Sequence, residues 1–157
     1  FRRVLFRSYG PRDGIVENLP PVTGNPYPAL VSNVDQDGND VAGIRLPDVS
    51  VPLASVPGWN LRHPDTGGPG QTHKTMGSTL PFAFTKQERQ DTSDPRPSIE
   101  ERYASRQDYL DRVETAAQDL ASERYMLEED VSRVFEMAGE RYDLLESRVK
   151  EAQPAGD

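Results

Sequence analysis

Three prolines divide the stretch from Asp40 to Arg62 at intervals of five residues, and this spacing restricts the fold more than any other feature of the sequence. They are Pro47, Pro52 and Pro57. Apolar residues recur around them, at Val41, Ile44, Leu46, Val49, Val51, Leu53 and Val56. Each proline removes a backbone donor and fixes φ, so a central β-strand cannot run through all three. The pattern predicts an extended, edge-like path over an apolar surface, ending beside the only tryptophan, Trp59.

The apolar content of the chain is low for a globular domain of 157 residues. Only 34% of the residues are apolar, and fourteen are proline. Disorder is one explanation for such a composition. The other is a segment that buries its apolar residues against protein outside this chain. The apolar positions cluster in patterned groups instead of scattering, and this favours the second explanation.

Charge and proline content divide the chain near Pro97. Residues 1–97 hold thirteen of the fourteen prolines and equal numbers of acidic and basic residues, ten of each. Residues 98–157 hold eight basic and sixteen acidic residues, which account for the whole net charge of −8. An acidic half repels phosphate backbones, so nucleic acid is not an expected partner. No apolar run reaches the eighteen residues that a membrane span needs, and the chain has no cysteine for disulfides or thiolate chemistry.

Four segments are predicted along the chain. Residues 1–8 are basic, and residues 2–8 look like the in-frame translation of a sequencing-library adapter, so we expect an artefactual scar. The alternative is a genuine basic N-terminal arm. Residues 9–97 should form extended segments, loops and a hairpin, with loops and polyproline-like conformation over residues 9–27. Residues 98–150 should be helical, and residues 151–157 a disordered tail.

Two short apolar runs, residues 29–34 and 41–46, flank an Asp-Gly turn at residues 35–40. This arrangement predicts a β-hairpin in which Gly38 adopts positive φ. Asp35, Asp37 and Asp40 also alternate as oxygen ligands of calcium do. However, glycine stands fourth instead of sixth, and the twelfth position is Leu46 instead of a bidentate glutamate. We therefore predict a turn stabilised by aspartate side chains, and no metal site.

No catalytic residue is predicted in this chain. His63 and His73 lie in a glycine-rich loop without a recognisable nucleophile partner. The chain contains no Gly-x-Ser-x-Gly nucleophile elbow. Ser147 and Lys150 match a Ser-x-x-Lys pair, but the companion motifs of penicillin-binding enzymes are missing. No cofactor is predicted either.

Helical signals dominate from Ser98 onward, after a short turn over residues 86–89 that Thr85 could cap. Thr85 and Ser98 each precede a glutamate by three residues, which is the capping-box spacing, and Ser105 can cap a longer helix. Phe82 and Phe84 would share one side of an extended segment. Two apolar stripes follow: Tyr109, Val113, Ala116 or Ala117 and Leu120, then Val131, Val134 or Phe135, Ala138, Tyr142, Leu145 and Val149. They predict an antiparallel helical hairpin that needs a further surface to cover its stripes.

Several motifs together resemble one known family. They are Gly14-Ile15-Val16, Tyr27-Pro28-Ala29-Leu30-Val31, Gly43-Ile44-Arg45-Leu46-Pro47, Gly58-Trp59-Asn60-Leu61-Arg62, Pro81-Phe82-Ala83 and Asp94-Pro95-Arg96-Pro97-Ser98-Ile99-Glu100-Glu101-Arg102-Tyr103. In this order the chain is similar, over roughly residues 9–142, to the C-terminal part of a largely uncharacterised family of bacterial alpha/beta-hydrolase-domain proteins. Agreement of many motifs is more specific than a single match.

This resemblance implies a longer parent protein whose serine nucleophile and general-base histidine lie upstream of residue 9. It implies an α+β fragment that packs on or covers a missing α/β-hydrolase core, which is its expected partner. The parent would be a serine hydrolase acting on ester or related acyl bonds, and this fragment alone would be inactive. Trp59 and Arg62 are candidate substrate-pocket residues, or alternatively they only hold their loop against the core. The alternative function is a non-catalytic interaction module that uses the acidic helical hairpin.

Overall fold

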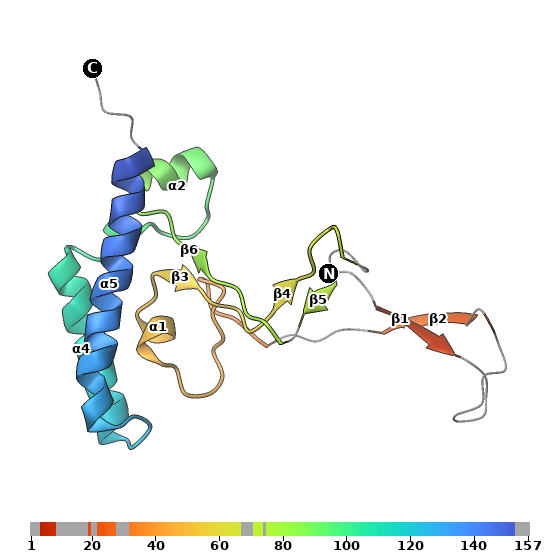
Figure 1. Ribbon diagram of the computed structural model, residues 1–157, viewed down its shortest axis with the longest axis horizontal. Coiled ribbons are helices and arrows are strands. Elements are labelled where there is room, and N and C mark those ends of the chain that lie inside the picture. Colours follow the sequence, from red (N-terminus) through yellow and green to blue (C-terminus); the bar gives the residue numbers. More distant parts are fainter. Residues whose placement is uncertain are drawn as a thin grey trace. The chain divides into compact units, whose positions relative to one another are not determined.

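The computed structural model describes residues 4–8, 19, 22–27, 32–66, 71–73 and 75–152 (Figure 1). The chain divides into two compact units. Unit 1 comprises residues 1–32 and 61–73, and unit 2 comprises residues 33–60 and 74–157. The segment boundaries expected from composition, at residues 8, 97 and 150, stay predictions.

Six strands and five helices are present in the described ranges. The strands are β1 (Val4–Ser8), β2 (Val22–Tyr27), β3 (Ala54–Ser55), β4 (Asn60–Leu61), β5 (Thr72–His73) and β6 (Leu80–Pro81). The helices are α1 (Pro47–Ser50), α2 (Lys86–Thr92), α3 (Ile99–Arg102), α4 (Arg106–Ser122) and α5 (Glu128–Ala152). The strands form three two-stranded sheets, β1-β2, β3-β6 and β4-β5. The predicted α+β class is consistent with this content.

Strands β1 and β2 pair antiparallel in unit 1, from Val4 opposite Tyr27 to Ser8 opposite Val22. The prediction of loops and polyproline-like conformation is therefore wrong for residues 22–27. In a two-stranded sheet both strands are edges, and an edge strand tolerates a residue such as Pro26 that lacks an N–H. Apart from Leu19, the remainder of residues 9–21 lies outside the described residues.

The proline-divided stretch is not extended throughout. Pro47 is the first residue of α1, a position where its fixed φ suits a helix and its missing N–H is not needed. The chain is buried from Pro52 to Ser55, and β3 pairs antiparallel with β6. The stretch thus enters the core in its middle, while Ile44 and Leu46 near its start remain exposed.

The Asp-Gly turn is confirmed, but the hairpin arms are shorter than predicted. Val34 and Asp40 form an isolated antiparallel bridge, and Gly38 has φ of 81°. Beyond this bridge, Gly43 has φ of 84°, a left-handed conformation that ends the second arm before it reaches residue 46. Residues 29–31 of the other predicted arm lie outside the described part of the chain.

The predicted caps are confirmed, and the short turn expected after Thr85 extends into the helix α2. Thr85 accepts a hydrogen bond from the backbone N of Glu88 at 3.1 Å, and Ser105 accepts one from Asp108 N at 3.1 Å. The carboxylate of Glu101 accepts from Ser98 N at 3.0 Å, at the start of α3. Each bond satisfies a donor that the first helical turn leaves unpaired.

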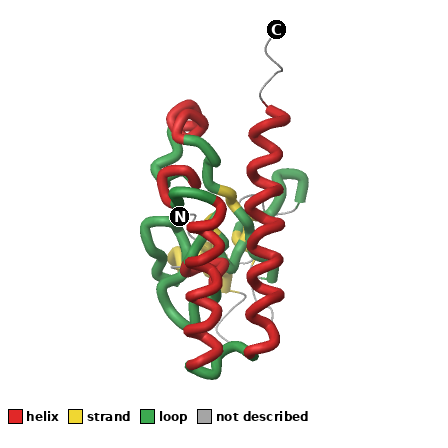
Figure 2. The backbone as a smooth tube through the Cα atoms, turned by 90° about the vertical axis from the view of Figure 1, so that its left-hand side faces the viewer, coloured by secondary structure: helices red, strands yellow, loops and turns green. Residues whose placement is uncertain are grey.

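Helices α4 and α5 lie side by side and antiparallel, joined by residues 123–127 (Figure 2). The predicted helical hairpin is confirmed. Its stripe on α4 uses Tyr109, Val113 and Ala117, together with Leu110, which the sequence pattern did not single out. None of the described helices combines the length and apolar character required to span a bilayer.

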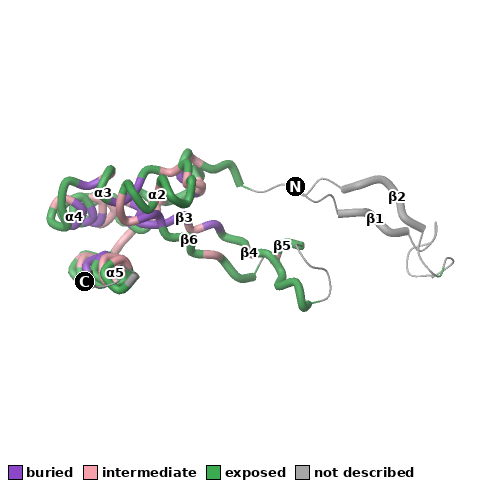
Figure 3. Tube along the Cα trace, turned by 90° about the horizontal axis from the view of Figure 1, so that it is seen from above, coloured by how far each residue is buried: buried purple, intermediate pink, exposed green. Residues whose placement is uncertain are grey.

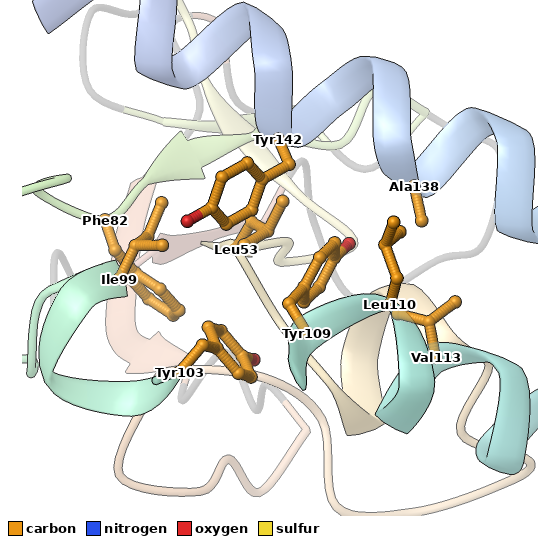
Figure 4. Packing of buried hydrophobic residues seen from close by; sticks show 9 residues of the cluster. All are labelled: Leu53, Phe82, Ile99, Tyr103, Tyr109, Leu110, Val113, Ala138 and Tyr142. Carbon is orange, nitrogen blue, oxygen red and sulfur yellow. The ribbon is translucent and has the colours of Figure 1, made fainter. Parts of the chain in front are cut away.

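The apolar stripes of the hairpin are covered by other segments of unit 2. Buried residues gather where α3, α4 and the β3–β6 sheet approach α5 (Figure 3). The core contains Leu53, Phe82, Ile99, Tyr103, Tyr109, Leu110, Val113, Ala138 and Tyr142 (Figure 4). Phe84 packs against this cluster, as expected from its spacing to Phe82. The core therefore draws on residues from both sides of Pro97.

Candidate functional site

A buried ion pair joins the Asp-Gly turn to α3. Arg102 Nη1 donates to Asp37 Oδ2 at 2.8 Å, and Arg102 Nη2 donates to the other carboxylate oxygen. The Arg102 and Asp37 side chains are only 13% and 9% exposed. A bidentate pair of this kind is geometrically specific, because the planar guanidinium matches the carboxylate.

A second arginine lies beside the first. Arg96 Nε and Nη2 donate to the Asp94 carboxylate at 2.9 and 2.6 Å, and these bonds hold the pKa of Asp94 below its ordinary value. Arg96 Nη1 also donates to Ser55 Oγ at 2.8 Å. Both guanidinium groups stack on the Phe82 ring, with Arg102 Cζ at 4.1 Å and Arg96 Cζ at 5.0 Å from its centroid. We call Asp37, Asp94, Arg96, Arg102 and Ser55 the arginine cluster.

The turn that carries Asp37 is held by its own side chains. Asp35 Oδ1 accepts from Asp37 N at 2.9 Å and from Asn39 N at 3.0 Å, while Arg45 Nη2 donates to Asp35 Oδ2 at 2.6 Å. Burial alone would raise the pKa of Asp35, but these hydrogen bonds outweigh it and the pKa is lowered. The prediction of a turn stabilised by aspartate is confirmed. Over the described residues, no cluster of histidine and carboxylate side chains is arranged to hold a metal ion.

Asn39 connects this turn to β3. Its side chain is fully buried; Nδ2 donates to Ala54 O at 3.2 Å, and Oδ1 accepts from Val56 N at 2.7 Å. Ser55 Oγ donates to Asp37 O. The arginine cluster is thus a connected polar network in which buried groups have partners, and such networks fix one arrangement of the segments that they join.

A groove of about 540 Å³ opens beside the cluster, between α2 and the C-terminal part of α5. Phe84, Leu145 and Val149 supply apolar lining. Charged and polar lining comes from Thr85, Gln87, Glu88, Asp91, Thr92, Asp94 and Arg148. The groove lies entirely within unit 2 and has the mixed lining, apolar with a few polar groups, that is typical of binding sites.

Hydrogen bonds fix the wall of this groove. Glu88 Oε2 accepts from Phe84 N at 2.7 Å, and Lys86 N donates to Glu100 Oε1 at 2.9 Å. The N–H and hydroxyl of Ser98, followed by Arg89, lower the pKa of Glu101 to about 2. Because Arg89 belongs to α2 and Glu101 to α3, their ion pair joins the two helices.

The two pocket residues predicted from sequence lie in different units. Trp59, in unit 2, is 36% exposed, and its carbonyl accepts from Ser78 Oγ at 3.0 Å. Arg62, in unit 1, donates its backbone N–H to Gln71 O at 2.9 Å. Neither residue lines the groove. Their role in a substrate pocket stays a prediction.

Several potential catalytic groups have structural partners. Ser98 Oγ donates to Glu101 at 2.8 Å. In the Ser-x-x-Lys sequence, Ser147 Oγ donates to Leu144 O at 2.9 Å and Lys150 pairs with Glu146 at 2.9 Å. His63 is exposed and lies beside Asp65, whose N–H donates to His63 Nδ1 at 3.3 Å. The Ser98 and Ser147 hydroxyls thus serve a helix cap and a helix turn, whereas the groove and the arginine cluster are suited to packing and binding.

Sequence reasoning did not identify the arginine cluster. Asp94 and Arg96 are two residues apart, a local signal that could have indicated their pairing. Asp37 and Arg102 are 65 positions apart, and no local pattern connects them.

Comparison with known proteins places the chain in a family. The model of the alpha/beta hydrolase domain matches residues 15–136, a range that includes the arginine cluster and the α2 side of the groove. Neither the curated proteins nor the solved structures gave a match. Since the match spans most of the sequence, the chain belongs to the alpha/beta hydrolase domain family.

Proposed function

We propose that this chain is the part of an alpha/beta-hydrolase-type protein that packs on or covers the catalytic core. The protein would be a serine hydrolase that acts on ester or related acyl bonds. The observation that carries the proposal is the family match over residues 15–136. The placed hydroxyls of Ser55, Ser98 and Ser147 bond to structural partners, which supports assigning the nucleophile to the core of the same polypeptide.

In such an enzyme the serine attacks the acyl carbonyl, histidine takes the proton, and backbone amides stabilise the oxyanion. All three groups would belong to the catalytic core. The residues of this chain would contribute binding and enclosure. The apolar lining at Phe84, Leu145 and Val149 offers a surface for the acyl chain or for the core itself, and Trp59 and Arg62 remain candidates for contact with substrate.

The arginine cluster supports this assignment by fixing the groove wall. It joins residues 37, 55, 94, 96 and 102 through bonds that leave little freedom. A segment that closes one side of a pocket needs such rigidity, because a displaced wall would misalign the substrate. Asp94 belongs to both the cluster and the groove lining.

The first test is activity of the chain alone. We expect no turnover of p-nitrophenyl acetate or butyrate, and no covalent labelling by a fluorophosphonate, which reacts with activated serines. Turnover that His63→Ala abolishes would place catalysis in this chain and refute the proposal. A second test is the coding sequence upstream of residue 9, which should contain Gly-x-Ser-x-Gly.

A third test uses a polypeptide that carries both the core and this segment. Val149→Asp puts a charge into the groove and should lower kcat/KM, while Leu144→Asp on the same helix should not, because Leu144 is 53% exposed and does not line the groove. Equal effects of the two substitutions would count against the role of the groove.

The alternative function is a non-catalytic module that binds a protein through its acidic helical hairpin. Exposed apolar residues at the loop end of the hairpin, such as Tyr125 and Leu127, favour this alternative. An upstream sequence without Gly-x-Ser-x-Gly, together with a cooperative melt of the isolated chain, would favour it over the hydrolase segment.

A further inference from the structure

The loop end of the helical hairpin exposes large apolar side chains around a hollow of about 400 Å³. Tyr125 and Leu127 are 56% and 61% exposed, and Leu46 and Met137 are 49% and 39% exposed. We define the loop hollow by the residues that line it: Leu46, Tyr125, Met126, Leu127, Asp130, Arg133, Val134 and Met137. None of these residues lines the groove between α2 and α5. The loop hollow is therefore a separate surface, and an inference about it does not depend on the hydrolase proposal.

The backbone holds the loop hollow in a fixed form. Tyr125 N donates to Leu120 O at 2.8 Å, and Arg124 N donates to Ala121 O at 3.0 Å. This pair of bonds is the Schellman motif, which ends a helix with one left-handed residue. That residue is Arg124, with φ of 66°. The exposed side chain of Tyr125 therefore follows a defined turn, and a fixed surface loses less entropy when it binds.

The chain around the loop hollow is strongly acidic. Residues 111–140 contain nine acidic and three basic residues, a net charge of −6, whereas the whole chain carries −8. Three exposed glutamates are close in sequence to the lining residues: Glu123 precedes Tyr125, and Glu128 and Glu129 follow Leu127. An exposed apolar surface bounded by charged side chains is typical of a protein contact.

The carboxylates at this end of the hairpin lack cations of their own. Elsewhere on α4 and α5, three carboxylates have basic partners: Asp108 pairs with Arg112, Asp143 with Arg106, and Glu146 with Lys150. Among the residues that the structure describes, no ion pair or side-chain hydrogen bond involves the carboxylates of Glu123, Glu128, Glu129 or Asp130. Like charges held close together repel one another, and a cationic partner would relieve this repulsion.

We propose that the loop hollow binds a basic amphipathic helix of a partner protein. Apolar side chains on one face of that helix fill the hollow, as in other contacts in which a helix lies in an apolar groove. Met126 and Met137 suit this role, because the flexible side chain of methionine adapts to the shape of its partner. Lysine and arginine residues beside the apolar face lie against Glu123, Glu128 and Glu129.

Charge distinguishes this occupant from the others. A second copy of the chain, an anionic membrane or a nucleic acid would bring further negative charge to an end that is already acidic. A small cation inside the hollow could meet Asp130, which belongs to the lining, but the three glutamates lie outside the lining. A helix is long enough to contact the hollow and the glutamates together, so it fits the arrangement better than a small molecule.

The test measures binding of a labelled peptide to the chain by fluorescence anisotropy at physiological ionic strength. The probe is a short peptide of lysine and leucine, with leucine at helical positions i, i+3, i+4 and i+7, and we expect saturable binding. Two control peptides have the same length. One has glutamate in place of every lysine and should not bind. The other has the same composition in an order without an apolar face, and it should bind at least tenfold more weakly.

Substitutions in the chain locate the contact. Leu127→Ser removes an exposed apolar side chain of the hollow. E128Q/E129Q removes two of the neighbouring charges and keeps the size of the side chains. Each change should raise the Kd of the peptide about tenfold, because apolar burial and charge attraction both contribute to the contact.

Matched variants elsewhere on α5 serve as controls. Leu144→Ser changes a leucine that is 53% exposed and lies outside the hollow. E140Q/E151Q removes two exposed glutamates that lie about 16 Å or more from Glu129 along the helix, which is beyond the range of unscreened attraction. Both controls should leave the Kd within about twofold of its original value.

Circular dichroism checks that each variant keeps its helices. Failure of the peptide to bind, or a Kd that neither Leu127→Ser nor E128Q/E129Q changes, would overturn the proposal. Equal binding of the peptide without an apolar face would overturn it too, because charge alone would then explain the attraction. Sedimentation velocity of the chain by itself tests the second copy: a dimer that Leu127→Ser abolishes would assign the hollow to that copy instead.

Discussion

Replacing Arg102 by alanine leaves the Asp37 carboxylate buried without its cation. The two side chains are 13% and 9% exposed and share two hydrogen bonds. Removal of one partner from a buried ion pair costs about 3–5 kcal/mol, because the remaining charge keeps its desolvation penalty. The substitution also removes the stacking on Phe82 at 4.1 Å and the bond from Arg102 Nε to Pro97 O at 2.9 Å. We therefore expect Arg102→Ala to lower the free energy of unfolding by at least about 3 kcal/mol.

Urea unfolding followed by circular dichroism at 222 nm measures this loss. Asp37→Ala and the double variant complete a double-mutant cycle. The double variant should be less destabilised than the sum of the single variants, because it leaves no unpaired buried charge. Lys150→Ala, which breaks the exposed Glu146–Lys150 pair, is the matched control and should change stability little.

Two results would refute this reasoning. One is a loss below about 1 kcal/mol for Arg102→Ala, the range of a surface ion pair. The other is strict additivity in the cycle, which would mean that Asp37 and Arg102 do not interact in solution.

Three further predictions concern the core, the hairpin turn and the buried tyrosines. Ile99→Ala should lower the free energy of unfolding, measured with urea, by about 2–5 kcal/mol because the side chain is fully buried. Leu144→Ala, at an exposed site, should change it by no more than about 0.5 kcal/mol. Similar losses at both sites would contradict the burial of Ile99 in the core. Arg124→Gly should raise the thermal midpoint and increase the free energy of unfolding by about 0.5–1 kcal/mol, because glycine adopts the φ of 66° without the left-handed penalty. A lower midpoint would contradict the left-handed conformation of residue 124. Burial raises the pKa of three tyrosines, in the case of Tyr103 to about 12. These tyrosines are Tyr103, Tyr109 and Tyr142. The stability that their burial contributes is present below pH 10 and is lost as the pH rises toward 12, so absorbance at 295 nm should show them ionising only as the protein unfolds. Titration of all six tyrosines near pH 10 would contradict their burial.

The helices could be predicted because their signals are local. Thr85, Ser98 and Ser105 stand at the cap positions. Thr85 and Ser105 each accept a hydrogen bond from the backbone N of the residue three positions later, and Ser98 donates its backbone N–H to the Glu101 carboxylate. The apolar stripes of α4 and α5 repeat at three and four residues, and this spacing alone defines the buried face. Leu110 was missed because it borders the stripe, although its side chain lies toward Ala138 of α5 (Figure 4).

The contacts between distant segments could not be predicted. Asp37 and Arg102 meet because the turn at residues 35–40 lies against α3, and the sequence near either residue contains no sign of this. The short helix α1 was missed because Pro47 suits a strand edge and a first helical position equally well. The arms of the predicted hairpin were too long because apolar residues such as Ile44 were expected to be paired, whereas Gly43 turns the chain away.

Amide hydrogen exchange tests most directly the claim that the middle of the chain and the helical hairpin form one core. Phe82 N donates to Leu53 O at 3.0 Å, and Ile99 N donates to Ala83 O at 2.9 Å. If the core is a single cooperative unit, these two amides should exchange with the same opening free energy as that of Val113 in α4. Exchange of the Phe82 and Ile99 amides at the rate of an exposed loop, with Val113 still protected, would contradict the account.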